Sequence, residues 1–148
     1  MQTWQQQALA AWPEYHQDIH EAYSPSELWL TLWDTFVAVS YGLRDEAALR
    51  CFYAYAWWSL DHSESTASAA VLHFYERLPD YARIREEMHH YLSIEQFDRI
   101  KESWRYGRSN EEYTALLRDL QNFREGKPLV NRVLPKHAFK GISARNKP

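Results

Sequence analysis

One stretch of the sequence, residues 28–60, constrains the fold more than any other. It contains nine of the chain's 23 aromatic residues, in two apolar blocks separated by Gly42 and the short polar run Leu-Arg-Asp-Glu. Each block is longer than a typical strand and apolar around most of its circumference, which is typical of helices buried on most of their surface. We therefore predict two central helices at the core of an all-α protein.

The length and the composition favour one helical domain. A chain of 148 residues can bury a sufficient core without disulfides or metals. Four glycines are too few for the many tight turns of a β-sandwich or barrel, and an aromatic share of 16% predicts a core of large rings with alanine between them. We expect a compact array of six to seven antiparallel or crossed helices over residues 1–126, followed by an irregular arm at 127–148.

Local signals place the helix ends. Ser24 and Glu27 predict a capping box at the start of one central helix, and Gly42 predicts its left-handed end. Pro13 should kink or break the first helical segment. Residues 63–66 have the composition of a polar linker. Further N-caps are expected at Asp45, Asp80 and Ser93.

Charge is distributed unevenly along the chain. Residues 127–148 contain six basic residues and no acid, so residues 1–126 carry a formal charge of −9. A basic arm on an acidic body is the one long-range electrostatic signal in the sequence. The arm could dock on its own body or on a partner protein, bind nucleic acid, or stay solvated; because no nucleic-acid module accompanies it, we expect contacts with protein. The residues expected to make these contacts are Arg132, Lys136, Phe139 and Lys140.

The single cysteine, Cys51, has no partner for an intramolecular disulfide. A lone thiol inside an apolar block fits a reducing compartment. The N-terminal residues lack the basic and apolar regions of a secretory signal, and no apolar run reaches the roughly 20 residues that a bilayer requires. We expect a cytoplasmic protein with no membrane partner.

Two histidine clusters are weak candidates for metal binding. His16 and His20 stand one helical turn apart, a spacing that can hold zinc if a further ligand joins them. Residues 86–90, Glu-Glu-Met-His-His, contain the Glu-x-x-His spacing of di-iron bundles, but the motif has no second copy. We interpret both clusters as solvated helix faces, and we expect no metal or other cofactor.

The second apolar block contains candidate ligand or interface residues. Tyr53, Trp57 and Trp58 could line a pocket for an apolar or cationic ligand, with Asp61 at its mouth. The alternative is core packing, with Tyr53 and Trp57 facing inward. His62 is better placed to satisfy helix-terminal carbonyls than to serve in a triad, because adjacent residues cannot converge. No motif assembles a catalytic group, so the sequence favours a non-enzymatic role.

Three short motifs lie between residues 56 and 97. They are a Trp-containing helix end at 57–63, Phe-Tyr-Glu-x-Leu at 74–78 and Leu-Ser-x-Glu-x-Phe at 92–97. With these motifs the segment resembles a group of short bacterial proteins of unknown function. The resemblance implies an all-helical cytoplasmic fold. Members of such groups include candidates for neutralising partners in toxin systems, and the resemblance supplies no catalytic residues.

Two kinds of function follow from these features. We hypothesise that the protein acts by binding another protein, which it neutralises or regulates. The alternative is a helical protein that binds a small ligand or a metal, through residues 57–61 or through His16 and His20. The acidic, aromatic-rich body and its oppositely charged arm favour protein binding.

Overall fold

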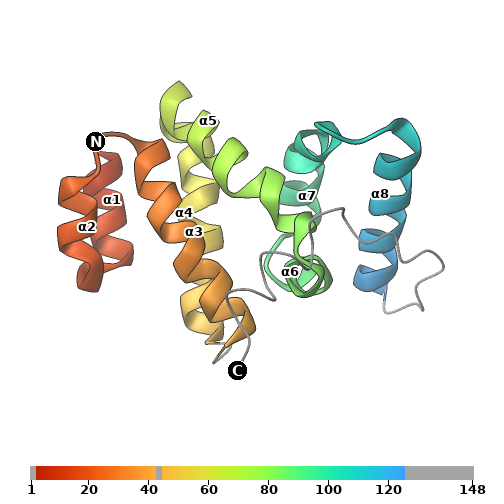
Figure 1. Ribbon diagram of the computed structural model, residues 1–148, viewed down its shortest axis with the longest axis horizontal. Helices are drawn as coiled ribbons and strands as arrows, with labels where there is room; N and C mark the ends of the chain where they lie inside the picture. The colour runs from red at the N-terminus through yellow and green to blue at the C-terminus, as the bar shows by residue number, and fades with distance from the viewer. Residues whose placement is uncertain (1–2, 43–44, 126–148) are drawn as a thin grey trace. The chain divides into compact units, whose positions relative to one another are not determined.

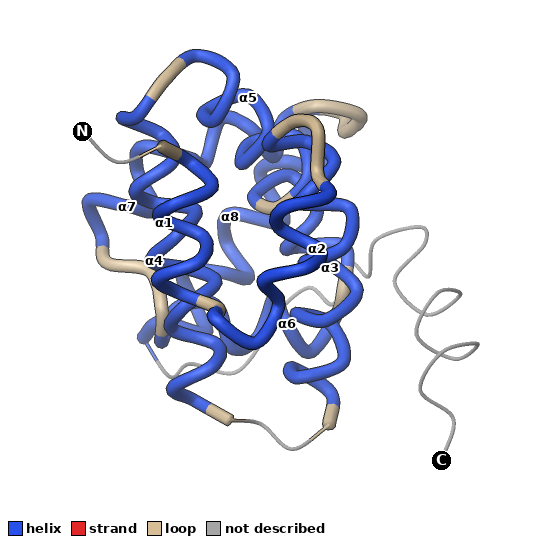
Figure 2. Tube along the Cα trace, turned by 90° about the vertical axis from the view of Figure 1, so that its left-hand side faces the viewer, coloured by secondary structure: helices blue, strands red, loops and turns tan. Residues whose placement is uncertain are grey.

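The computed structural model describes residues 3–42 and 45–125 (Figure 1). All regular elements in these ranges are helical (Figure 2), which confirms the predicted all-α class. The chain divides into two compact units, with the boundary between Phe74 and Tyr75. A single domain over residues 1–126 stays a prediction, and the basic arm at 127–148 lies outside the described residues.

The N-terminal unit begins with a broken helix, as Pro13 predicts. Proline cannot donate to the helical ladder, and here it starts a short 3₁₀ segment instead. The elements of this unit are α1 (Trp4–Ala11), η1 (Pro13–Tyr15), α2 (His16–Glu21), α3 (Pro25–Tyr41), α4 (Glu46–His62) and α5 (Glu64–His73).

Side-chain caps define the starts of α3 and α4. The N–H of Glu27 donates to Ser24 Oγ (3.2 Å), and the N–H of Ala48 donates to Asp45 Oδ1 (3.2 Å), which confirms both predicted N-caps. The carboxylate of Glu27 accepts its bond from the N–H of Tyr23 (3.2 Å). In a capping box this carboxylate would accept from the N–H of the N-cap residue, Ser24. Here the donor is the residue before it, one position away from the prediction.

Two predictions about helix ends are wrong. Gly42 ends α3 with φ of −98°, outside the left-handed region. Its small size matters instead, because a Cβ there would lie 2.7 Å from the carbonyl oxygen of Ala38. Residues 63–66 are the cap and first turn of α5, where Ser63 and Thr66 form a complete capping box. Polar residues that resemble a linker therefore start a helix.

The core of the N-terminal unit is a continuous set of aromatic rings. The fully buried ring of Phe74 lies at its centre, with centroid distances of 5.0 to 6.1 Å to Trp29, Trp33, Phe36 and Tyr53. α5 packs against both α3 and α4 (Figure 1). Its Ala69 and Ala70 are fully buried, and such small side chains let neighbouring helices approach closely. The aromatic core is thus confirmed.

Short helices alternate with 3₁₀ segments in the C-terminal unit. Ser93 and Gln96 form the complete capping box that starts α7, so the N-cap predicted at Ser93 is confirmed. Gly107 has φ of +74°, a left-handed conformation that glycine adopts without strain. The elements are η2 (Tyr75–Asp80), α6 (Ala82–Glu87), η3 (Met88–His90), α7 (Ile94–Ile100), η4 (Lys101–Arg105) and α8 (Asn110–Glu125).

The N-cap predicted at Asp80 is wrong. Tyr81 occupies the cap position of α6 and makes no side-chain cap bond. Asp80 Oδ1 instead accepts a hydrogen bond from Arg108 Nη2 (2.6 Å). The ion pair with this distant arginine takes the place of a local cap bond.

Several charged side chains of this unit are buried. Glu87 belongs to the segment that we expected to be a solvated face, yet it is 8% exposed and pairs with Arg83 (3.2 Å). Arg85 Nη1 lies 4.0 Å from Asp119 Oδ2, and both side chains are almost completely buried. The cost of burying each of these charges is offset by an oppositely charged neighbour rather than by solvent.

Candidate functional site

The structure places the predicted aromatic site residues in two environments. Tyr53 is a core residue that contacts Phe36 and Phe74. The ring of Trp58 stacks on His62, with centroids 4.3 Å apart. Trp57, which we expected to face inward, is only partly buried, and Asp61 is exposed. The interface role of these residues stays a prediction, and the four site residues predicted in the arm, Arg132, Lys136, Phe139 and Lys140, lie outside the described residues.

Both histidine clusters are on the surface to a large extent. His16 and His20 are exposed on α2, and the structure shows His89 partly exposed, with its ring 3.9 Å from that of His90. Burial, with the neighbouring His90, lowers the pKa of His89. Over residues 3–42 and 45–125, no group of three or more His, Cys, Asp or Glu residues has a metal-binding arrangement.

A small pocket lies between the end of α1 and the first turns of α4. Its volume is about 250 Å³. Trp12 and Phe52 form part of its wall, and their rings pack against each other with centroids 5.1 Å apart. The rest of the lining combines polar or ionisable side chains with small apolar ones: Glu14, Tyr15, Asp45, Cys51, Ala11, Val39, Ala47 and Ala48.

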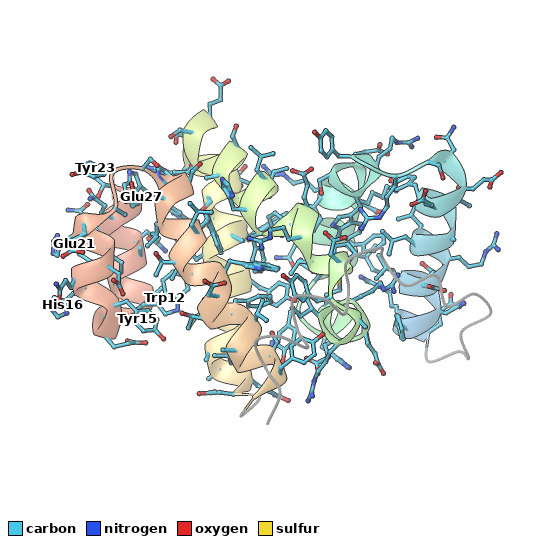
Figure 3. The ribbon with its side chains drawn as sticks, viewed as in Figure 1. Trp12, Tyr15, His16, Glu21, Tyr23 and Glu27 are labelled. Carbon is cyan, nitrogen blue, oxygen red and sulfur yellow. The ribbon has the colours of Figure 1, made fainter. Side chains whose placement is uncertain are left out.

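Two local features of the chain create this pocket. Pro13 ends the α1 segment and starts η1, which brings Glu14 and Tyr15 beside the end of that helix. Figure 3 shows Trp12 and Tyr15 at the same end of α1 and α2, with His16 pointing away from them. On the other side, Asp45 is fixed by its cap bond to Ala48. Each side of the pocket therefore depends on a helix end.

The pocket lining is acidic. Glu14 and Asp45 contribute two carboxylates, and none of the lining residues in the described ranges is a lysine or arginine. Burial raises the pKa of Tyr15, and the negative charges of Glu14 and Asp18 raise it further. The Tyr15 hydroxyl therefore stays protonated at neutral pH and can donate a hydrogen bond.

The surface of the whole N-terminal unit has the same sign. Residues 1–74 contain nine acidic and two basic residues, a formal charge of −7. All nine carboxylates are on exposed residues: Glu14, Asp18, Glu21, Glu27, Asp34, Asp45, Glu46, Asp61 and Glu64. Residues 75–126 contain eleven acidic and nine basic residues. Most of the net negative charge of residues 1–126 thus belongs to the N-terminal unit.

Sequence reasoning did not identify this pocket. Its residues come from α1, η1, α3 and α4 and from the positions that flank them, so no single motif contains them. The only local signals were the break at Pro13, followed by Glu14 and Tyr15, and the capping residue Asp45. Those signals predict where helices end and begin, but not that the end of α1 lies beside the start of α4.

Comparisons with protein-family models, with curated proteins and with solved structures give no match to this chain. Within the described ranges, no helix has both the length and the apolar character needed to cross a bilayer.

Proposed function

We propose that this protein binds another protein through the acidic surface of its N-terminal unit, and that binding neutralises or regulates a basic partner. The observation that carries the proposal is the charge of that unit: nine exposed carboxylates against two arginines. The resemblance of residues 56–97 to short bacterial proteins, some of them candidates for neutralising toxins, supports the same role. The proposed location is the cytoplasm, where the lone Cys51 would stay reduced.

Charge of one sign over a compact unit has a direct effect on association. It attracts an oppositely charged surface over about a Debye length, roughly 8 Å at physiological ionic strength, and raises the association rate. It also disfavours acidic partners, because like charges brought together in an interface are repelled. The partner best suited to this unit therefore carries a cluster of lysine and arginine.

Small-ligand binding is less well supported by the geometry. Sites that enclose a small molecule usually have volumes of about 300 to 1,000 Å³. The pocket at Trp12 has about 250 Å³ and is lined by charge as well as by rings. It fits one side chain of a protein partner better than a complete small molecule.

Affinity capture with a charge-reversed variant tests the proposal. The variant combines Glu14→Lys, Asp18→Lys and Glu21→Lys, three exposed positions on η1 and α2. Tagged wild-type protein is expected to retain one stoichiometric basic protein from an extract of its own cells. The variant should lose that protein, because three reversals change the charge of the N-terminal unit by six.

A matched control reverses the same number of charges on the other unit. It combines Glu86→Lys, Glu95→Lys and Glu111→Lys, all exposed. The control is expected to retain the partner, and circular dichroism should show both variants to be folded. Failure to recover any stoichiometric protein would contradict the proposal, as would equal retention by both variants.

A further inference from the structure

We propose that the pocket formed by Trp12, Glu14, Tyr15, Asp45 and Phe52 binds one arginine side chain of the partner protein. This inference rests on the proposed function and deepens it, because it assigns the residue type that anchors the partner. Anchors of this kind are common in protein interfaces, where a few arginine and aromatic residues seated in pockets carry most of the binding energy.

The size of the pocket selects a single side chain. At about 250 Å³ it is below the usual range for a complete small molecule, but it can accept the end of a long side chain. The half-buried ring of Tyr15, next to the almost completely buried Trp12 and Phe52, offers apolar surface to the methylene groups of such a chain. Long basic side chains often bury their apolar stems in this way.

The charge of the pocket selects a cation. Glu14 and Asp45 are in the lining, and Asp18 and Glu46 follow them within a few residues in the sequence, where Arg44 and Arg50 are the nearby basic residues. The N-terminus of α4 adds a helix dipole equivalent to about half a positive charge, and the cap bond of Asp45 already satisfies one of the free N–H groups of that helix. The four carboxylates therefore outweigh the two arginines and the dipole, and the pocket favours a positive group. The raised pKa of Tyr15 agrees with that sign.

The combination of rings and carboxylates favours arginine over lysine. A guanidinium group is planar and can stack on an aromatic face while its N–H groups donate to a carboxylate. An ammonium group is more strongly hydrated and loses more on entering an apolar pocket. Tyr15, which is half-buried, supplies the face, and Glu14 and Asp45 supply the acceptors.

Titration with blocked amino acids tests this inference without the partner. The probes are N-acetyl-arginine amide, its neutral isostere N-acetyl-citrulline amide and N-acetyl-lysine amide, added to isotopically labelled full-length protein and followed by NMR. The arginine probe should shift the NMR signals of the Trp12 indole N–H and of the backbone amides of Cys51 and Phe52. Citrulline and lysine should bind several-fold more weakly. Equal binding of either one would overturn the assignment.

Variants of the pocket separate specific binding from general attraction. Glu14→Gln combined with Asp45→Asn removes both charges yet keeps a capping side chain at position 45. This double variant should weaken arginine binding about tenfold. The matched control, Glu27→Gln with Glu64→Gln, removes two exposed charges that do not line the pocket, and it should change binding less than about twofold. Equal weakening by both pairs would overturn the inference.

A filling substitution provides a second measurement that leaves every charge in place. Ala48→Leu adds volume to the pocket lining and suits a helix. It should abolish the shift at Trp12; an unchanged arginine affinity would overturn the inference. The probes need no partner, so their binding can be measured even if the capture experiment recovers no protein. A captured partner combined with no probe binding would overturn only the pocket assignment.

Discussion

The indole ring of Trp12 packs against the ring of Phe52 with centroids 5.1 Å apart, although 40 positions separate them in the sequence. The contact joins the end of α1 to α4 and forms part of the pocket wall. Trp12 also lies 5.1 Å from Tyr55, so one side chain connects the pocket to the aromatic core. The pocket is therefore as rigid as the core packing behind it.

Replacing Trp12 should both destabilise the fold and disrupt the pocket. Trp12 is 3% exposed, and Trp12→Ala should lower the free energy of unfolding by about 3 to 5 kcal/mol because it leaves a large cavity. Urea denaturation followed by tryptophan fluorescence measures the change. The control is Leu72→Ala at an exposed site of α5, with an expected change within about 0.5 kcal/mol. Similar losses in the two variants would contradict the packing described here.

The cap of α5 gives a second prediction. Ser63 accepts a hydrogen bond from the N–H of Thr66 (3.2 Å), so Ser63→Ala should cost about 1 kcal/mol of stability. Ser68→Ala, at an exposed position inside the same helix, should be neutral or slightly stabilising because alanine favours helices. Thermal unfolding compares the two. If Ser63→Ala proves as harmless as Ser68→Ala, residues 63–66 act as a linker after all.

The success of sequence reasoning depended on how local each feature is. Caps at Ser24, Asp45 and Ser93 were predicted correctly because a cap bond spans only three residues. Asp80 failed because its partner, Arg108, lies 28 residues away.

Burial of charge was equally hard to predict. Arg85 and Asp119 break the apolar pattern of their helices, and only the tertiary structure shows that they face each other. The pocket combines residues from four elements, so the sequence predicted the helix ends that form it but not that these ends lie together.

The buried pair of Arg85 and Asp119 gives a third prediction. Burial raises the pKa of Asp119, although Arg85 opposes the rise, and Asp119 Oδ1 has no hydrogen-bond partner among the described residues. Asp119→Leu should cost about 3 to 5 kcal/mol, because it leaves a buried charge without its counter-ion. Adding Arg85→Met should recover most of that loss. A double-mutant cycle by urea denaturation measures the coupling, and additive losses would contradict it.

An exposed pair serves as the control for that cycle. Lys101 Nζ lies 3.3 Å from Asp98 Oδ1, and both side chains are largely accessible to solvent. Replacing either residue with alanine should change stability by no more than about 1 kcal/mol, because solvent and salt screen exposed ion pairs.

Alkaline pH gives a fourth prediction. Burial raises the pKa of both Tyr55 and Tyr75 well above the ordinary value of about 10, and Ser59 only partly offsets the rise at Tyr55. Since the folded state holds these protons more tightly than the unfolded chain, their contribution to stability is complete below pH 10 and is lost as pH rises toward the folded pKa. Stability should therefore fall steadily above about pH 10.

Tyrosinate absorbance and circular dichroism measure this effect together. Helix loss should accompany ionisation of the two buried hydroxyls, and Tyr75→Phe should reduce the slope of stability against pH. Reversible ionisation of Tyr55 and Tyr75 with the helices intact would contradict the burial described for them.

The most direct test of the central claim is the salt dependence of the affinity for the captured partner. Raising the salt concentration from roughly 0.05 M to 0.5 M shortens the Debye length and screens exposed charges. If the acidic N-terminal unit recognises a basic surface, the dissociation constant should rise about tenfold or more over this range, mainly through a slower association rate. A dissociation constant that stays unchanged would contradict recognition by charge.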